Sequence, residues 1–359
     1  MRETLSEIGA RDKNREGGAM KLFFHFDTDE TRQCLLSRAR NVALRAIQQY
    51  EIEWNCIRFL QLSDTITYKI ETDMSGYLLR IHSDKVTKEE ILSELVFLNE
   101  IRKIKDLIVP EGLRSRNGSY VLECETEEEY RKPYVSMMKW VDGERLNGAS
   151  TEDHVYSLGV MIGRLHEASI GFNIPHDFVR PHWGSTSFRK EVTKLERYYP
   201  RFLSSGSWEL YQEAIDKIIR QLDSMPRNAG NYGIIHGDLH SGNVVFNNGQ
   251  PYPIDFGRCG YGYFLYDVAA SLLELDPRQR GLLIQGYESV IKLDEEYIRD
   301  LECFFIMIMI ENYCHHSSNT SEIPNLINEQ KYALAYLNEY LIDRSFLFNT
   351  IEPVETEIT

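Results

Sequence analysis

The chain has 359 residues, 42% of them hydrophobic, which is enough for two ordinary domains or one two-lobed enzyme with a sizeable core. Its 55 acidic residues outnumber 40 basic ones and give a formal charge of -15, which argues against a broad nucleic-acid footprint or an anionic membrane surface as the main partner. The same charge would favour a cationic substrate, although acidic surfaces also simply keep proteins soluble.

The first part of the chain is predicted to contain a tail followed by a strand-rich region with two helices. Residues 1–22 are polar and lack the apolar stretch of a secretory signal, so we expect a loosely ordered tail. Apolar residues at helical spacing predict helices over 29–51 and 87–105. Alternating apolar and polar residues predict strands over 56–62, 65–71, 76–82, 119–123 and 134–140. Residues 23–139 then form an N-terminal lobe.

Near residue 140 the sequence changes from strand to helix patterns. Helices are expected over 154–168 and 208–222, short strands and loops over 233–255, and mostly helices over 267–341. The longest apolar run, Leu301–Ile310, is far shorter than the roughly 20 residues of a membrane span and predicts a buried helix. Residues 140–359 therefore form a larger helical lobe, and the chain has an α+β plan of two lobes joined by one hinge.

The six cysteines form no C-x-x-C pair, so the sequence indicates neither a disulfide framework nor a zinc site of that kind. This usage fits a reducing compartment, and we expect a cytoplasmic protein without a nucleic-acid or membrane partner. The sequence leaves the oligomeric state open.

The most informative motif is His-Gly-Asp-x-x-x-x-Asn, followed by Asp-Phe-Gly with Asp255 twelve residues after Asn243. Phosphoryl transfer requires a carboxylate that orients or accepts the hydroxyl proton, and oxygen ligands that hold Mg²⁺ against the phosphates. We predict that Asp238 is the catalytic base and that Asn243 and Asp255 are the metal ligands.

The motif has two other interpretations. Asp, Asn and Gly are common turn residues, so the motif could be a set of ordinary turns. His236 and His240 could bind zinc, but hydrolytic zinc sites place such a pair on a helix with a Glu between, whereas this pair lies in a loop that contains Gly237 and Gly242.

The motif resembles that of the aminoglycoside phosphotransferase and choline kinase-like family, distant relatives of protein kinases, and the resemblance covers roughly residues 25–315. It implies a protein-kinase-like fold with a small β-rich N-terminal lobe carrying helices and a larger helical C-terminal lobe. It also implies ATP and Mg²⁺ as cofactors. The similarity continues over residues 261–269, where it makes Asp267 structural; read alone, Asp267 is a helix N-cap. His236 is also assigned a structural role.

The resemblance places phosphate-binding groups in the N-terminal lobe. The turn Ser63-Asp64-Thr65 lies where the family has its nucleotide-binding hairpin, although it lacks the glycine-rich pattern of protein kinases and a plain β-turn is the alternative. Arg80 stands where a lysine usually grips the α- and β-phosphates, and a guanidinium preserves that role. Its expected partner is Glu94, with Glu90 as the near alternative.

The strand over 134–140 resembles the one that meets the adenine. Backbone groups near Met138 and Trp140 would contact the base, and Met137 or Met138 offers a polarizable surface. One of the two methionines is expected to be plain core.

The acceptor is expected to be a small molecule, because residues 256–266 leave no room for the long activation segment of protein kinases and His240 replaces their usual lysine. An amine-bearing acceptor, such as an aminoglycoside-, choline- or homoserine-like alcohol, suits the acidic and aromatic composition. Candidate acceptor-binding residues are Glu274, Asp276, Glu288 and Glu311, although helical carboxylates are often merely solvated. A serine/threonine protein kinase and an inactive nucleotide-binding protein remain the alternatives.

Overall fold

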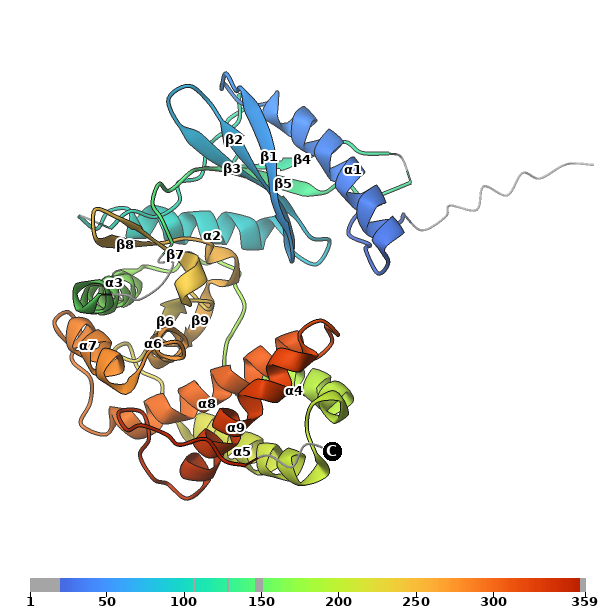
Figure 1. Ribbon diagram of the computed structural model, residues 1–359. Helices are drawn as coiled ribbons and strands as arrows, with labels where there is room; N and C mark the ends of the chain where they lie inside the picture. Colours follow the sequence, from blue (N-terminus) through green and yellow to red (C-terminus); the bar gives the residue numbers. More distant parts are fainter. Residues whose placement is uncertain (1–19, 106, 128, 146–150, 356–359) are drawn as a thin grey trace, which may run out of the picture.

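The computed structural model describes residues 20–355 except 106, 128 and 146–150. Figure 1 shows a strand-rich lobe above a larger helical lobe, with helix α2 (Lys88–Ile101) lying between the sheet and the helical lobe. The α+β architecture expected from the sequence, a strand-rich lobe and a larger helical lobe, is therefore confirmed. The division at residues 139 and 140 follows the end of the last strand of the sheet and stays a prediction.

The N-terminal lobe is built on one antiparallel sheet with the strand order β1-β2-β3-β5-β4. Its elements are α1 (Asp29–Ile47), β1 (Cys56–Leu62), β2 (Thr65–Glu71), β3 (Gly76–His82), α2 (Lys88–Ile101), β4 (Val121–Glu123) and β5 (Tyr134–Lys139). The apolar face of α1 packs with one face of the sheet in a single cluster of buried side chains. The inner residues of α2 instead join the core of the C-terminal lobe, so α2 links the two lobes.

The alternation of side chains along β3 decides which residues face α2. Successive residues of a strand point to opposite faces of the sheet. Leu79 and Ile81 accordingly belong to the cluster under α1, whereas Arg80 and His82 are buried on the opposite face. With this register, the charged side chain of Arg80 lies at the junction between the lobes.

The C-terminal lobe is mostly helical. Its helices are α3 (Glu152–Gly171), α4 (Ser185–Tyr198), α5 (Ser205–Ser224), α6 (Phe264–Leu272), α7 (Pro277–Glu288), α8 (Tyr297–His316) and α9 (Ile323–Leu341). Two small antiparallel pairs lie among them, β6 (Tyr232–Ile235) with β9 (Gly260–Tyr263) and β7 (Val244–Asn247) with β8 (Gln250–Pro253). The short 3₁₀ turns are η1 (Tyr199–Arg201), η2 (Ser241–Asn243) and η3 (Phe256–Arg258).

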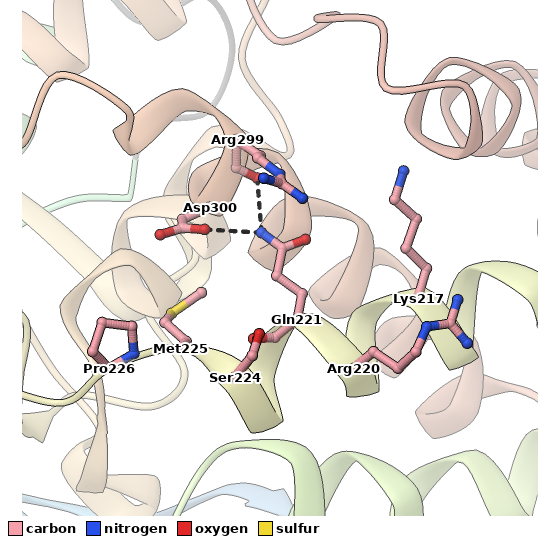
Figure 2. Close-up of a pocket in the computed structure, with 8 residues that line it drawn as sticks. All are labelled: Lys217, Arg220, Gln221, Ser224, Met225, Pro226, Arg299 and Asp300. Carbon is pink, nitrogen blue, oxygen red and sulfur yellow. Dashed lines mark hydrogen bonds between the residues drawn. The ribbon is translucent and has the colours of Figure 1, made fainter.

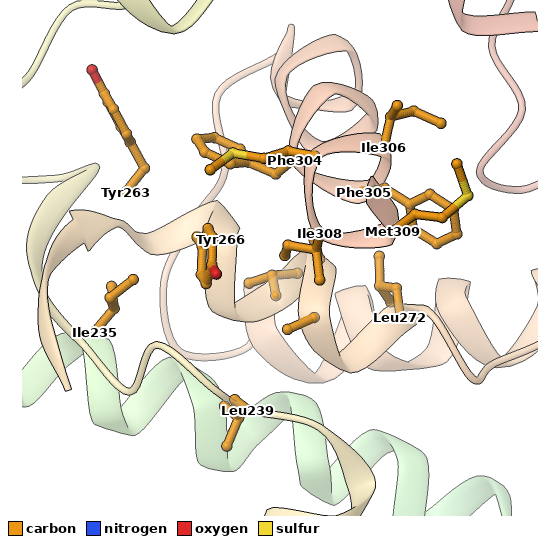
Figure 3. Close-up of a cluster of buried hydrophobic side chains, with 14 of the residues drawn as sticks. Ile235, Leu239, Tyr263, Tyr266, Leu272, Phe304, Phe305, Ile306, Ile308 and Met309 are labelled. Atoms are coloured by element: carbon orange, nitrogen blue, oxygen red, sulfur yellow. The ribbon is translucent and has the colours of Figure 1, made fainter. Parts of the chain in front are cut away.

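The apolar run of α8 forms the centre of this lobe. Every residue of Leu301–Ile310 is buried, as the sequence predicted. Figure 3 shows Phe304 and Ile308 of α8 beside Tyr266 and Leu272 of α6. No helix in the described part of the chain has the length and apolar character needed to cross a bilayer.

The predicted elements differ from the observed ones mainly at the helices. Strands β1, β2 and β3 have the predicted bounds, whereas α1 and α2 end four residues earlier than predicted, at Ile47 and Ile101. Helix α4 was not anticipated. The predicted tail falls largely on residues 1–19, which lie outside the described residues, and at its end Lys21 pairs with Tyr130.

Candidate active site

The loop that carries Asp238 is held by the carboxylate of Asp267. This side chain, fully buried in the first turn of α6, accepts the backbone N–H groups of His236 at 2.6 Å and Gly237 at 2.9 Å. His166 of α3 lies 3.3 Å from the same carboxylate. Asp267 therefore fixes the backbone immediately before Asp238. The prediction that it is the N-cap of its helix was wrong, because α6 begins three residues earlier, after Tyr263.

Gly237 is required where it stands. Its φ of +76° lies in the left-handed region, and a Cβ atom there would come within 2.6 Å of the Arg258 carbonyl oxygen and 2.7 Å of Trp183 Nε1. The chain can therefore turn sharply before Asp238 only with glycine at this position.

Asn243 and Asp238 are in direct contact. The Asn243 side-chain Nδ2 donates to the Asp238 carbonyl oxygen at 2.9 Å and to Asp238 Oδ2 at 3.1 Å. Because the amide nitrogen is turned toward Asp238, the amide oxygen is the end available to a cation. The five-residue spacing in the sequence thus places an acidic oxygen and an amide oxygen together.

Asp255 is joined to this pair through the β7–β8 hairpin. The Ile254 N–H donates to the Asn243 carbonyl oxygen at 2.8 Å, and His236 Nε2 lies 2.9 Å from the Ile254 carbonyl oxygen. Asp255 itself adopts the left-handed conformation, with φ 61° and ψ 63°, which is uncommon for a residue other than glycine. His236 thereby acts as a brace, consistent with its predicted structural role.

The donor set around Asp255 fits a magnesium–nucleotide complex. Within the described ranges, no group of three or more His, Cys, Asp or Glu side chains gathers to hold a metal ion. Mg²⁺ commonly binds through one or two protein oxygen ligands, with phosphate and water oxygens completing its shell. One carboxylate from Asp255 and one amide oxygen from Asn243 suit that arrangement.

Arg80 and Glu94 form the predicted pair. The two Arg80 terminal nitrogens lie 2.6 and 2.7 Å from the two Glu94 carboxylate oxygens, and both side chains are buried. Burial alone would lower the pKa of Arg80, but Glu94, and after it Asp255, raise it. Burial would likewise raise the pKa of Glu94, and the charge of Arg80 holds it below its usual value. Glu90, the alternative partner, instead closes the capping box of α2 with Thr87.

The other predicted nucleotide contacts are less well placed. Ser63, Asp64 and Thr65 form the turn between β1 and β2, where the Ser63 N–H donates to the Thr65 carbonyl oxygen at 3.0 Å. Met138 is fully buried in the core, and the Trp140 N–H donates to the Gly76 carbonyl oxygen at 2.9 Å. Of the two backbone groups of Trp140, the carbonyl is therefore the one free to contact an adenine base.

Of the four acidic residues predicted to bind the acceptor, the structure brings Glu311 to the site. The Tyr266 hydroxyl donates to Glu311 Oε2 at 2.7 Å, while Oε1 is buried and has no hydrogen-bond partner within the described part of the chain. Burial raises the pKa of Glu311 to about 7, against the opposing effects of Tyr266 and Arg258, and the carboxylate of Asp238 is close enough to raise it further.

The remaining acidic candidates have other surroundings. Asp276 caps α7 by accepting the Gln279 N–H at 2.9 Å, and Glu274 is exposed between α6 and α7. Glu288 ends α7, which packs along α3. None of the three forms a hydrogen bond with Asp238 or Asn243 in the described structure, and helix capping accounts for Asp276.

Arg258 and Trp183 were not singled out from the sequence. The Arg258 guanidinium lies 4.5 Å from the Trp183 ring centroid, and Trp183 Nε1 donates to the Arg258 carbonyl oxygen at 2.9 Å. Burial opposes the charge of Arg258, but Tyr266, Asp238 and Glu311 raise its pKa. The position of Arg258 directly after Asp-Phe-Gly was the available signal, whereas Trp183 lies in an unassigned loop.

A separate surface pocket of about 340 Å³ lies between the C-terminal end of α5 and the start of α8 (Figure 2). Lys217, Arg220 and Arg299 supply its cations, and Gln221 Nε2 donates to Asp300 at 2.8 Å. None of the predicted site residues lines this pocket. It is therefore distinct from the site around Asp238.

The chain is similar in sequence to known proteins. Amicoumacin kinase of Bacillus subtilis (strain 168) is 25% identical over 234 residues, which span 64% of this chain and 66%, just under two thirds, of that protein. An uncharacterized protein of Synechocystis sp. (strain ATCC 27184 / PCC 6803 / Kazusa) is 30% identical over 250 residues, or 68% of this chain and 67% of that one.

Solved structures show the same fold. The structure of a microcompartment-associated aminopropanol kinase superposes with a TM-score of 0.73 at 24% identity, over 85% of this chain and 98% of that one. An amicoumacin kinase in complex with AMP-PNP and Ca²⁺ gives a TM-score of 0.71 at 18% identity, over 87% and 96%. The model of the phosphotransferase enzyme family matches residues 58–301, and the chain belongs to this family.

Proposed function

We propose that the protein transfers the γ-phosphoryl group of ATP to a hydroxyl of a small, amine-bearing molecule. The observation that carries the proposal is the contact of Asn243 with Asp238 beside the braced turn of Asp255. This contact supports an arrangement in which a carboxylate that can take a proton lies next to two oxygen ligands for a divalent ion, as phosphoryl transfer requires.

In this proposal each residue has one task. The Asp238 carboxylate orients the acceptor hydroxyl and accepts its proton as the oxygen bonds to the γ-phosphorus and the bond to the β-phosphate oxygen breaks. The Asn243 amide oxygen and the Asp255 carboxylate hold Mg²⁺, which neutralises phosphate charge when bound. Arg80, fixed by Glu94, binds the α- and β-phosphates.

The adenine is assigned to the backbone after β5. The Trp140 N–H is already bonded to Gly76, whereas no hydrogen bond of the Val141 N–H occurs among the described residues. We therefore assign the base-contacting donor to Val141 and keep the Trp140 carbonyl as an acceptor. Met138 contributes packing rather than a polar contact.

The acceptor class rests on Glu311. The charge of Asp238 acts on the Glu311 carboxyl group, and Glu311 Oε1 is buried without a hydrogen-bond partner among the described residues, so we propose that Glu311 pairs with an ammonium on an acceptor whose hydroxyl meets Asp238. Aminopropanol, the named substrate of one structural neighbour, carries both groups. We also propose a cytoplasmic location, which is supported by the six free cysteines because such cysteines fit a reducing compartment.

A phosphate-transfer screen tests the proposal. Purified protein is incubated with γ-labelled ATP or GTP, Mg²⁺ and either a panel of amino alcohols and aminoglycosides, matched diols without an amine, or a protein extract. We expect label from ATP in an amine-bearing alcohol, reduced about 100-fold or more by Asp238→Ala. Label confined to the protein extract would favour a protein kinase, and label in none of the pools would favour a binding protein without turnover.

A further inference from the structure

Arg180 lies in the connection between α3 and α4 and is only 6% exposed. Its guanidinium donates to four backbone carbonyl oxygens: Nε to Cys259, Nη2 to Gly257 at 2.6 Å and to Phe256 at 3.3 Å, and Nη1 to Glu90 at 3.1 Å. Three of these acceptors belong to the turn directly after Asp255, and the fourth belongs to α2 of the other lobe. No carboxylate of the described residues forms an ion pair with Arg180, so its bonds are all to backbone.

The turn bound by Arg180 follows a residue in an unfavourable backbone conformation. Asp255 occupies the left-handed region with φ 61°, a conformation that persists only when the surrounding structure fixes it. On its N-terminal side, the Ile254 carbonyl oxygen is braced by His236 at 2.9 Å. On its C-terminal side, the bracing comes from Arg180.

The loop between α3 and α4 also forms hydrogen bonds with α2. The Val179 N–H donates to Ser93 Oγ at 2.9 Å, beside the Arg180 bond to the Glu90 carbonyl oxygen. The next residue after Ser93 is Glu94, which holds Arg80. Residues 179–180 thus touch both the helix that orients the phosphate-binding arginine and the turn that carries the metal-binding aspartate.

We propose that Arg180 is a positioning residue that sets the Asp255 turn and α2 in register, so that the metal ligand and Arg80 reach the nucleotide together. The proposal rests on the proposed function only in assigning metal and phosphates to these residues. An arginine is required because a planar fork with five donors spans carbonyls on two elements, whereas an ammonium is a compact point charge.

The test compares Arg180→Ala and Arg180→Lys with Arg280→Ala. Arg280 is a matched control, since it is 3% exposed and donates to the carbonyl oxygens of Leu272 and Leu347 and to the Tyr336 hydroxyl, but to no group of α2 or of the turn after Asp255 among the described residues. AMP-PNP binding is measured by calorimetry at increasing Mg²⁺ concentrations. Hydrogen exchange of residues 88–94 and 256–260 is measured on the full chain without nucleotide.

We expect both Arg180 variants to need about 10- to 100-fold more Mg²⁺ for half-maximal AMP-PNP binding, the range typical of groups that orient metal ligands. Hydrogen exchange should accelerate in both segments together, while Arg280→Ala changes neither measurement. Arg180→Lys keeps the positive charge, so the same two measurements can be made on it if the alanine variant does not fold.

Parent-like Mg²⁺ dependence in the Arg180 variants, or faster exchange in only one of the two segments, would overturn the inference. If the parent protein bound AMP-PNP without any need for Mg²⁺, the proposed function would fail instead. The exchange measurement would still decide whether Arg180 couples the two segments.

Discussion

Arg80 and Glu94 form an ion pair that is almost entirely removed from water, with 4% and 2% of their side chains exposed. Taking two charges out of water is costly, and their mutual attraction offsets this cost only while both partners remain. The pair therefore serves to fix the orientation of the Arg80 guanidinium, both of whose terminal nitrogens are held by Glu94.

This view predicts an unusual mutation series. Arg80→Met and Glu94→Met should each lower the free energy of unfolding by about 3–5 kcal/mol, because each leaves a buried charge unpaired. The double variant should be more stable than either single variant, yet still need more ATP than the parent. Urea unfolding and the KM for ATP provide the readouts. Additive losses in the double variant would show that the pair does not act as a unit.

Glu311 gives the site a pH dependence. Because its pKa is raised to about 7, chiefly by burial, the carboxylate gains its charge only as the pH rises through neutrality. An acceptor ammonium should therefore bind more tightly, with a lower acceptor KM, at about pH 8 than at about pH 6. Glu311→Gln should flatten this dependence.

Tyr266→Phe is a control that should shift the pH dependence of the acceptor KM rather than flatten it. The Tyr266 hydroxyl donates to Glu311 and lowers its pKa, so removing it should move the transition in acceptor KM to higher pH. An unshifted transition in this variant, or a persistent one in Glu311→Gln, would assign the titration to another group.

At the scale of elements, two helices of the C-terminal lobe meet through glycines. A Cβ atom on Gly159 of α3 would collide with the Leu283 carbonyl oxygen of α7, and one on Gly286 would collide with the Tyr156 carbonyl oxygen of α3. The two backbones thus lie in direct contact. This contact fixes α3, which supplies His166 to the carboxylate of Asp267.

Gly159→Ala should lower the free energy of unfolding by about 1–3 kcal/mol, because the extra methyl group forces the helices apart. Gly171→Ala in the same helix is the control: no heavy atom lies within 4 Å of the added carbon, so little change is expected. Equal effects of the two substitutions in urea unfolding would mean that helix propensity, rather than packing, governs the response.

The sequence predicted the hairpin strands with their correct bounds because alternation and turn residues act locally. Helix α4 was missed although Phe188, Val192 and Leu195 lie at helical spacing, because these three apolar residues stand in a segment that is otherwise polar and charged. The structure packs this apolar face on α8 and α5.

For the whole molecule, the sequence was most informative where function requires fixed spacing. The contact of Asp238 with Asn243 and the pairing of Arg80 with Glu94 follow the motif and the register of one strand and one helix. Arg180 could not be predicted, because its four acceptors are 76 to 90 residues away and are backbone groups with no side-chain signature.

Calorimetric titration of ATP into the parent, Asp238→Ala and Asp255→Ala proteins, with and without Mg²⁺, tests the central assignment most directly. The account predicts Mg²⁺-dependent binding by the parent and by Asp238→Ala within a few-fold of each other, because Asp238 acts on the acceptor. Asp255→Ala should lose the Mg²⁺-dependent part of binding. Unchanged Mg²⁺ dependence in Asp255→Ala, or loss of binding in Asp238→Ala equal to that in Asp255→Ala, would contradict the roles given to these aspartates.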